Sequence, residues 1–358
     1  MNINFSAPIN QLGYGVVGTN LLLELSKLNN VCLWPIGPID CEEKLIPEIK
    51  ANLKNAGSFD YDAPSLRVWH QWDMGLNIGR GKKYGLTFFE MDNLKPNEKH
   101  SLDFLDKIFV CSDWAKEVIV KSGINESKVK VIRLGVDQSI FKECEIDNVK
   151  TTRLLSIGKW EIRKGHDLIL DILENTFTPE DDFKLVMCCS NPFLSQEEQD
   201  QWISYYEKSK FFDKIVVLKN RLKTQNDVYE LMKKSDIGIF PYRAEAWNLE
   251  LAEMLSIGKN CIATNYSGPT EYAIESGCYL INPQGTESAN DLKWFDGSAS
   301  WAKLGQNYVD DFSKQLKELH IKKQNGNLKK NISGIEFFKN HTWENACKQI
   351  VEEIQSEN

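Results

Sequence analysis

The sequence predicts an α/β fold of two domains, each built on a parallel sheet with helices on both faces. Short apolar segments with the length of buried strands alternate with helical segments through both halves of the chain. The chain has 358 residues, of which 42% are hydrophobic and 26% charged, which is enough for two cores of ordinary domain size. In sheets of this kind, ligands bind at the carboxyl ends of the strands.

The expected elements follow one another as strand, helix and strand. A glycine-rich segment at 13–18 opens the first helix, 19–28, and the polar segment 142–152 separates the halves. Polar residues 325–333 lead into a last amphipathic helix at 335–354, with Trp343 near its start. Strands are expected at 3–5, 31–34, 67–69, 86–89, 107–110 and 130–132, and then at 153–157, 183–187, 214–218, 237–240, 261–264 and 278–281. Two Rossmann-like domains are therefore expected.

Composition limits the function classes that the chain can belong to. The formal net charge of −8 argues against nonspecific binding to nucleic acid, so no nucleic-acid partner is expected. Nine cysteines lie scattered without a C-x2-C pair, which is typical of buried thiols in a reducing compartment, and neither a disulfide scaffold nor a metal site is expected. The first residues lack a signal-peptide pattern, and no run of about 18 apolar residues occurs. We expect a cytoplasmic protein without a transmembrane segment, and peripheral contact with a membrane stays open.

Two carboxylates eight residues apart form the most informative motif. Glu245 follows the apolar segment 237–240 and a short turn, and Glu253 lies in the helical pattern that comes next. Glu245 is thus expected in a strand-to-helix loop, with Glu253 about two turns along the helix. A ligand across the helix N-terminus would meet both carboxylates and the free backbone N–H groups of residues 246–249. The spacing predicts a site for one long polar ligand.

The segment from Glu245 to Glu253 resembles the Glu-x7-Glu motif of the family 4 glycosyltransferases, which have the GT-B fold. The resemblance implies two Rossmann-like domains facing a central cleft, and a C-terminal helix that crosses back to the first domain. It implies an acceptor domain at 1–148, a nucleotide-sugar donor domain at 149–334 and the crossing helix at 335–358.

The same resemblance assigns roles around the two carboxylates. Glu245 would bind hydroxyls of the donor sugar, and Glu253 the ribose of the nucleotide. The family has Gly-Phe-Gly directly after the first glutamate, whereas this chain has larger side chains there, which leaves the identity of the donor open. The residues expected at the donor in this segment are Ala246, Trp247, Asn248 and Leu249.

A second motif, Gly-Lys-Trp-Glu-Ile-Arg-Lys-Gly at 158–165, resembles the family's G-R-L-x-x-x-K-G, with Lys159 in place of the arginine. When the bond between sugar and phosphate breaks, negative charge grows on the leaving oxygens, and Lys159 and Lys164 can stabilise it without a metal. A lysine does not hold two oxygens as an arginine fork does, so either Lys159 acts more weakly than the family's arginine or Arg163 contributes as a further donor ligand. Gly158 is expected at the donor as well. The alternative is a solvated basic turn.

The segment Gly-Tyr-Gly-Val-Val-Gly at 13–18 matches the dinucleotide fingerprint G-x-G-x-x-G. A nicotinamide site also needs an acidic residue at the end of the second strand, and 31–36 contains none; Asp40 lies further along. In the family, a glycine-rich loop here lets the backbone approach the donor phosphate or the acceptor, and this places Gly15 at the substrate. A tight turn without ligand contact is the alternative.

The family often has a histidine after its fourth strand, at the donor sugar. This chain has Phe-Phe-Glu-Met-Asp at 88–92, so Glu90 is one candidate for that position. His70, at the end of the preceding strand, is the other, although a histidine beside tryptophans is more often structural. Both are kept as catalytic candidates. Asn220 and Arg221 fall where the family docks the nucleotide base.

The resemblance implies transfer of a sugar from a UDP- or GDP-sugar to an acceptor hydroxyl, with retention of configuration and without a metal or other cofactor. The acceptor is expected to be a carbohydrate or a glycolipid. Two other classes stay open: an NAD-dependent oxidoreductase that uses the loop 13–18, and a noncatalytic GT-B protein that binds sugar.

Overall fold

A computed structural model describes residues 1–357, with every side chain except that of Ser58. The chain forms two compact units, residues 1–137 with 340–358, and residues 138–339. The domain boundaries expected at 148/149 and 334/335 stay a prediction. In the described part of the chain, no helix has both the length and the apolar character needed to cross a membrane.

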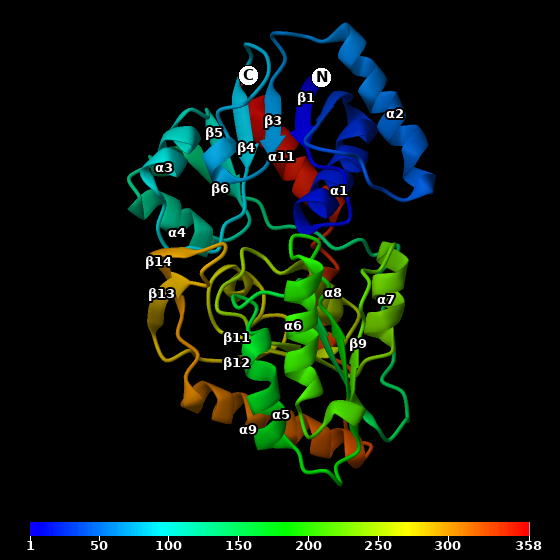
Figure 1. Cartoon of the computed structure of the whole chain (residues 1–358). Coiled ribbons are helices and arrows are strands. Elements are labelled where there is room, and N and C mark those ends of the chain that lie inside the picture. Colours follow the sequence, from blue (N-terminus) through cyan, green and yellow to red (C-terminus); the bar gives the residue numbers. More distant parts are fainter. Residues whose placement is uncertain (358) are drawn as a thin grey trace. The chain divides into compact units, whose positions relative to one another are not determined.

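The first unit is built on a six-stranded sheet in the order β2-β1-β3-β4-β5-β6, and all of its strand pairs are parallel (Figure 1). Helix α11, the last of the chain, belongs to this unit and packs beside α1, as expected for a crossing helix. The elements are β1 Asn2–Ala7, α1 Gly13–Leu28, β2 Asn30–Pro35, η1 Glu43–Leu45, α2 Ile46–Lys54, η2 Asn55–Ser58, β3 Ser65–Val68, η3 Gln71–Asp73, β4 Lys83–Leu86, α3 Pro96–Asp103, β5 Lys107–Val110, α4 Asp113–Lys121, η4 Glu126–Lys128, β6 Val129–Val131 and α11 Trp343–Glu357.

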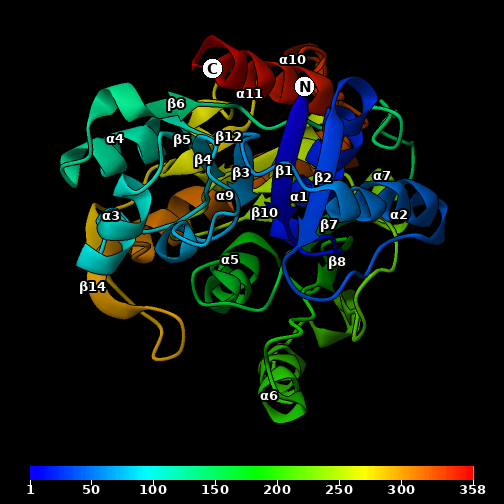
Figure 2. The same cartoon turned by 90° about the horizontal axis from the view of Figure 1, so that it is seen from above.

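The second unit has a six-stranded parallel sheet in the order β12-β11-β10-β7-β8-β9 and a separate antiparallel hairpin, β13–β14. Helices α5 and α9 pack side by side (Figures 1 and 2). The elements are β7 Thr152–Ile157, η5 His166–Leu168, α5 Ile169–Thr176, β8 Phe183–Cys188, α6 Gln196–Glu207, η6 Phe212–Lys214, β9 Ile215–Val217, α7 Gln225–Lys233, β10 Ile237–Phe240, α8 Leu249–Ser256, β11 Asn260–Thr264, η7 Gly268–Glu271, β12 Tyr279–Ile281, β13 Thr286–Asn290, β14 Asp296–Ala302, α9 Gln306–Gln324 and α10 Ile332–Phe338.

Several helices begin where a short polar side chain satisfies a free backbone N–H group. Ser112 caps α4, and Ser195 and Thr224 form capping boxes at the starts of α6 and α7. The strands are short and apolar because both faces of a parallel sheet are buried. Every residue of β10, Ile237–Phe240, is buried.

Three expected elements differ clearly in the structure. The helix predicted at 19–28 is α1, Gly13–Leu28, which already includes the glycine-rich segment. The strand predicted at 86–89 is β4, Lys83–Leu86, and Phe88 and Phe89 lie in the loop that follows. The helix predicted at 335–354 is two helices, because α10 ends at Phe338 and α11 begins at Trp343. Asn331 caps α10 by accepting the N–H of Gly334 (3.1 Å), so the polar lead-in contains the start of a separate helix that packs against α8.

Each sheet has one point where the strand order reverses, and such points are where open α/β sheets bind ligands. In the first unit it lies between β1 and β3. In the second it lies between β7 and β10, which are neighbours in the sheet although two strands separate them in the chain. The loops after these four strands are therefore the first places to look for a site.

Candidate functional site

The strongest cluster of charged side chains lies in the second unit, on the loops that follow β7 and β10. Lys164 donates to one carboxylate oxygen of Glu245 (Nζ–Oε1 2.7 Å), and Arg163 reaches the other oxygen (Nη1–Oε2 3.0 Å). All three side chains are 10% exposed or less. The two sequence motifs thus meet at the point where the strand order reverses.

Arg163 also binds a second carboxylate, Glu161. Its Nε and Nη2 donate to Glu161 Oε2 (3.0 and 2.7 Å), and its Nη1 donates to the carbonyl oxygen of Ala244 (2.7 Å). Lys159 contacts the other oxygen of Glu161 (Nζ–Oε1 3.1 Å), and its side chain keeps 35% exposure. Arg163 therefore ties the two loops together, whereas Lys159 is the more accessible cation.

The buried charges in this cluster keep one another ionised. Burial alone would raise the pKa of Glu161, but Arg163, and after it Lys159 and Lys164, outweigh burial and lower that pKa to about 2. Burial would likewise raise the pKa of Glu245, and Arg163 and Lys164 lower it instead. Burial would lower the pKa of Lys164, but the carboxylates of Glu245 and Glu250 hold it above its ordinary value. The cluster is charged throughout the physiological range.

Two glycines let these loops approach so closely. Gly158 has φ +134°, and a β-carbon there would lie 3.0 Å from Lys164 Cδ and Nζ. Gly165 has φ +72°, and a β-carbon there would lie 1.8 Å from the carbonyl oxygen of Pro241, in the loop after β10. Any larger residue at either position would move Lys164 or separate the loops.

Helix α8 begins at an unusual backbone conformation. Asn248 has φ +66°, in the left-handed region, and its side chain accepts the N–H of Leu251 (3.1 Å). The family that the motif resembles has glycine there, and asparagine is among the few other residues that tolerate this region. Asn248 therefore keeps the conformation and adds a helix cap. Leu249, which follows it, is half-buried at the first position of α8.

The residues between Glu245 and α8 are packed into the unit. Ala246 is 7% exposed and Trp247 3%, and the indole of Trp247 lies 4.7 Å from the ring of Tyr272. The hydroxyl of Tyr272 donates to the carbonyl oxygens of Trp247 and Asn248 (2.7 and 3.0 Å). Among the described residues, the buried Nε1 of Trp247 has no hydrogen-bond partner. These contacts fix the loop that carries Glu245.

Glu253, the second carboxylate of the motif, is 7% exposed within α8. Asn220 and Arg221 follow β9, the edge strand, and are separated from β7 by β8. Asn220 is exposed and Arg221 half-buried. The structure therefore joins Arg163, Lys164 and Glu245 directly, and Lys159 joins them through Glu161. It places the expected base-binding residues two strands away from β7.

The candidates of the first unit also gather where its strand order reverses. His70 follows β3, and its ring lies 4.6 Å from that of Tyr14, near the start of α1. Tyr14 donates to the carbonyl oxygen of Phe88 (2.7 Å), after β4. Burial, followed by the charge of Glu90, raises the pKa of Tyr14. The ring of His70 thus packs against that of Tyr14, and the charge of Glu90 acts on the Tyr14 hydroxyl.

Gly15 lies inside α1 rather than in a loop before it. A β-carbon there would lie 2.1 Å from Asn10 Oδ1, an atom that also accepts the N–H of Leu12 (2.9 Å). Close packing against Asn10 is therefore a sufficient reason for glycine at this position.

Sequence reasoning missed four participants in these clusters. Glu161 lies inside the second motif between two cations, and that position was the available signal. Glu250 is a first-turn carboxylate of α8 whose charge acts on Lys164. Tyr14 lies inside the glycine-rich segment. Ser267, which accepts the N–H of Glu245 (2.9 Å), comes from the loop after β11 and gave no local signal.

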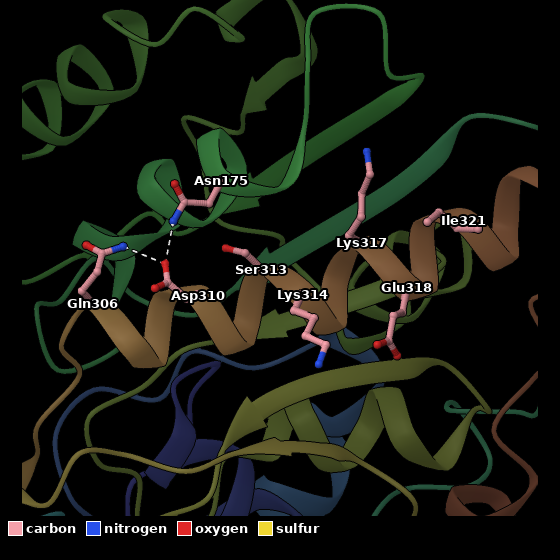
Figure 3. Close-up of a pocket in the computed structure, with 8 residues that line it drawn as sticks. All are labelled: Asn175, Gln306, Asp310, Ser313, Lys314, Lys317, Glu318 and Ile321. Carbon is pink, nitrogen blue, oxygen red and sulfur yellow. Dashed lines mark hydrogen bonds between the residues drawn. The ribbon is translucent and has the colours of Figure 1, made fainter.

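A further cavity of about 620 Å³ lies along α9 next to Asn175 (Figure 3). Several of its polar groups already have partners: Asp310 accepts from Asn175 (3.2 Å) and Gln306 (2.9 Å), and Lys317 binds Asp181 (3.0 Å). None of the sequence-predicted site residues lines it, so we assign it no ligand.

The fold and the charged cluster can now be compared with known proteins. Over almost its whole length the chain has the GT-B fold, with two Rossmann-like domains. HepE of Anabaena, solved with UDP and glucose, has a TM-score of 0.69 at 13% identity, and the match covers 99% of this chain and 100% of HepE. Sucrose-phosphate synthase of Thermosynechococcus elongatus has a TM-score of 0.70 at 12% identity, with 99% and 98% covered. The lipopolysaccharide outer core galactosyltransferase WaaB has a TM-score of 0.67 at 14% identity, with both chains fully covered.

A comparison with protein-family models gives a match within the second unit. Residues 138–294 match the model of "Glycosyl transferases group 1". The second unit thus carries a glycosyltransferase group 1 domain, and this range contains both motifs of the charged cluster. No curated protein matches the chain.

Proposed function

We propose that the chain is a glycosyltransferase of family 4 type, which moves a sugar from a nucleoside diphosphate sugar to an acceptor hydroxyl with retention of configuration. The observation that carries the proposal is the buried cluster of Lys164, Arg163 and Glu245 where the strand order of the second sheet reverses, inside the segment that matches glycosyl transferases group 1. Because HepE was solved with UDP-glucose, a UDP-sugar is the first donor to test, before a GDP-sugar.

In this mechanism the lysines stabilise the leaving diphosphate. The ammonium group of Lys164 has three N–H donors, and one of them binds Glu245 (2.7 Å). The other two are available to phosphate oxygens. Lys159 adds a second, more exposed cation. Both act on charge that grows as the bond from sugar to phosphate breaks, so they stabilise the transition state more than the bound donor. No metal is required for this step.

The carboxylates would bind the neutral parts of the donor. Glu245 stays ionised and is held at its backbone by Ser267, so its oxygens can accept sugar hydroxyls. Arg163, whose donors are directed at Glu161, Glu245 and Ala244, acts as a positioning residue for Glu245. Glu253 would bind the ribose.

The rest of the donor extends from this cluster along the ends of the strands and of α8. The base would lie at Asn220 and Arg221, and the backbone N–H groups at the start of α8 would meet the phosphate. The leaving phosphate takes the proton of the acceptor hydroxyl as the new glycosidic bond forms. The acceptor, a carbohydrate or glycolipid, would meet the surface of Tyr14, His70 and Glu90 in the first unit.

The first experiment is calorimetry of the full chain with UDP, GDP, ADP, their common sugar conjugates and NAD. We expect one nucleoside diphosphate and its sugar conjugate to bind. Binding of NAD alone would contradict the proposal and favour the oxidoreductase. Binding of a nucleotide sugar without release of nucleotide, with any acceptor offered, would leave a noncatalytic sugar-binding protein.

The variant Lys164→Ala then tests the catalytic step. Loss of one electrostatic contact to the developing charge costs roughly 10²–10³-fold in turnover. We expect that loss in nucleotide release from the bound donor, with a smaller fall in melting temperature than in a variant of Arg163, because Glu245 keeps its ion pair with Arg163. Lys184→Ala, an exposed lysine of β8, is the matched control and should change neither quantity. If the turnover of Lys164→Ala fell only in proportion to its folded fraction at the assay temperature, the catalytic assignment of Lys164 would be removed.

A further inference from the structure

A second cavity of the second unit lies outside the charged cluster. It has a volume of about 430 Å³ and lies between α6, the β13–β14 hairpin and the loop after β7 (labelled in Figure 1, except the loop). This is within the range of about 300–1,000 Å³ that small-ligand sites occupy. We call it the hairpin cavity.

Aromatic side chains form much of the wall of the hairpin cavity. Trp202, on α6, stacks on the buried Trp160 with ring centroids 5.3 Å apart and an angle of 6° between the planes. Tyr205, one turn further along α6, lines the cavity too. Opposite them, Trp294 extends from the hairpin and is 46% exposed. Its neighbour Phe193, 6.3 Å away and edge-on, is 53% exposed. Large apolar side chains that are gathered and exposed in this way mark an interaction surface.

The turn that carries Trp294 is held in place before any ligand arrives. Asp291 Oδ1 accepts the backbone N–H groups of Lys293, Trp294 and Phe295 (3.0, 2.7 and 2.9 Å). Leu292, in the same turn, has φ +61°, a conformation that costs free energy for a residue other than glycine. Strain of this kind persists only where other contacts impose it, so the hydrogen bonds to Asp291 hold the backbone that carries the exposed indole.

The polar groups of the rim carry both signs of charge. Glu198 of α6 forms an ion pair with Lys293 of the hairpin, and Gln201 of α6 adds an exposed amide. Lys293 also lies over the ring of Trp294 (5.3 Å), and Lys159 lies over the ring of Phe193 (5.0 Å). These lysines would repel a cationic ligand, and Glu198 and the other carboxylates would repel an anionic one. A neutral ligand with many hydroxyl groups finds both donors and acceptors.

Aromatic faces with hydrogen-bonding groups around them suit a carbohydrate, because a sugar ring has an apolar C–H face and a polar rim. We propose that the hairpin cavity binds a segment of a neutral oligosaccharide, which stacks on Trp294 and Trp202 and hydrogen-bonds to Gln201 and Glu198. This site is separate from the donor site proposed above, and the inference does not depend on catalysis. The two sites meet at Glu161, which lines the cavity and is bound by Arg163 and Lys159, and at Lys159 itself, which lies over Phe193 at the rim.

The test is calorimetry and saturation-transfer NMR on the full chain, with tetrasaccharides of α-glucan, β-glucan, galactan and chitin, and with choline and UDP as competing classes. Trp294→Ala removes the exposed wall without emptying a core. Phe212→Ala, which removes a 42% exposed aromatic of the same unit outside the cavity, is the matched control. We expect at least one tetrasaccharide to bind, about tenfold more weakly in Trp294→Ala, and equally well in Phe212→Ala.

The inference would be overturned if no tetrasaccharide binds, if binding is the same in Trp294→Ala, or if choline binds in this cavity in place of the sugars. Competition between UDP and the tetrasaccharide would also overturn it, because the sugar would then occupy the donor site. The affinity of Trp294→Ala for UDP should equal that of the unmodified chain. If the donor proposal fails, the chain does not bind UDP or its sugar conjugates; if the oligosaccharide inference fails, UDP binding is unchanged and tetrasaccharide binding is lost or insensitive to Trp294→Ala.

Discussion

Replacing Arg163 by methionine should destabilise the second unit more than any substitution of an exposed charge. The guanidinium is buried and is directed at two carboxylates and one carbonyl oxygen: Glu161 at 2.7 Å, Glu245 at 3.0 Å and Ala244 at 2.7 Å. Methionine has similar length and fills the space, so the substitution removes the charge and the donors but leaves little cavity.

The expected loss of stability follows from the polar groups that stay buried when the guanidinium is removed. Glu161 keeps its ion pair with Lys159, Glu245 keeps its ion pair with Lys164, and the carbonyl of Ala244 loses its donor. Removing one partner from a buried ion pair costs about 3–5 kcal/mol. This variant removes contacts of two carboxylates and one carbonyl at once, although Lys159 and Lys164 still offset part of the charge. For a unit of this size, each kcal/mol lowers the melting temperature by roughly 2–4 °C, so a fall of roughly 6–20 °C is expected.

The assay is urea unfolding followed by tryptophan fluorescence, together with the melting temperature, in the unmodified chain and in Arg163→Met. Lys233→Met is the control: this lysine pairs with Glu230 at 3.4 Å, both side chains are more than 40% exposed, and the expected change is below about 1 kcal/mol. A loss in Arg163→Met no larger than in the control would refute the reasoning, since the cluster would then behave as a solvated set of charges.

Two further predictions concern the same loops. The pKa of Glu161 is lowered from 4.5 to about 2, so its contribution to the free energy of unfolding is present above about pH 4.5 and is lost as the pH falls toward 2; the full contribution is about 3 kcal/mol. The pH dependence of unfolding between pH 5 and 3 should therefore be flatter in Glu161→Gln, and parallel curves would show that this carboxylate does not titrate as described. Asn248→Ala should cost about 1–2 kcal/mol, because it loses the cap on Leu251 and keeps φ +66°, whereas Asn248→Gly should cost only a few tenths. Chemical denaturation compares them, and a larger loss in the glycine variant would contradict the conformational argument.

The alternation of apolar and amphipathic segments was sufficient to predict two parallel sheets, because strand composition and helical periodicity are local properties. Both sheets, the crossing of the last helix to the first unit and the strands at 153–157 and 237–240 agree with the structure. Boundaries were less secure. Phe88 and Phe89 extend an apolar run past the end of β4, and their place is decided by the bond from Tyr14 to the carbonyl of Phe88. Likewise, the helical pattern breaks between α10 and α11 because α10 packs on α8 of the second unit and α11 on α1 of the first.

The sequence by itself determined the candidates for the site: the spacing of Glu245 and Glu253 and the cations of 159–164 are readable along the chain. Only the tertiary structure decided that the two motifs meet, because β7 and β10 are neighbours solely through the order of strands in the sheet. It also decided the role of Arg163, whose donors are used by Glu161 and Glu245, and it brought Ser267 to the backbone of Glu245. Local patterns specify strands and loops, whereas contacts between loops depend on how the strands are ordered, and no spacing along the chain records that order.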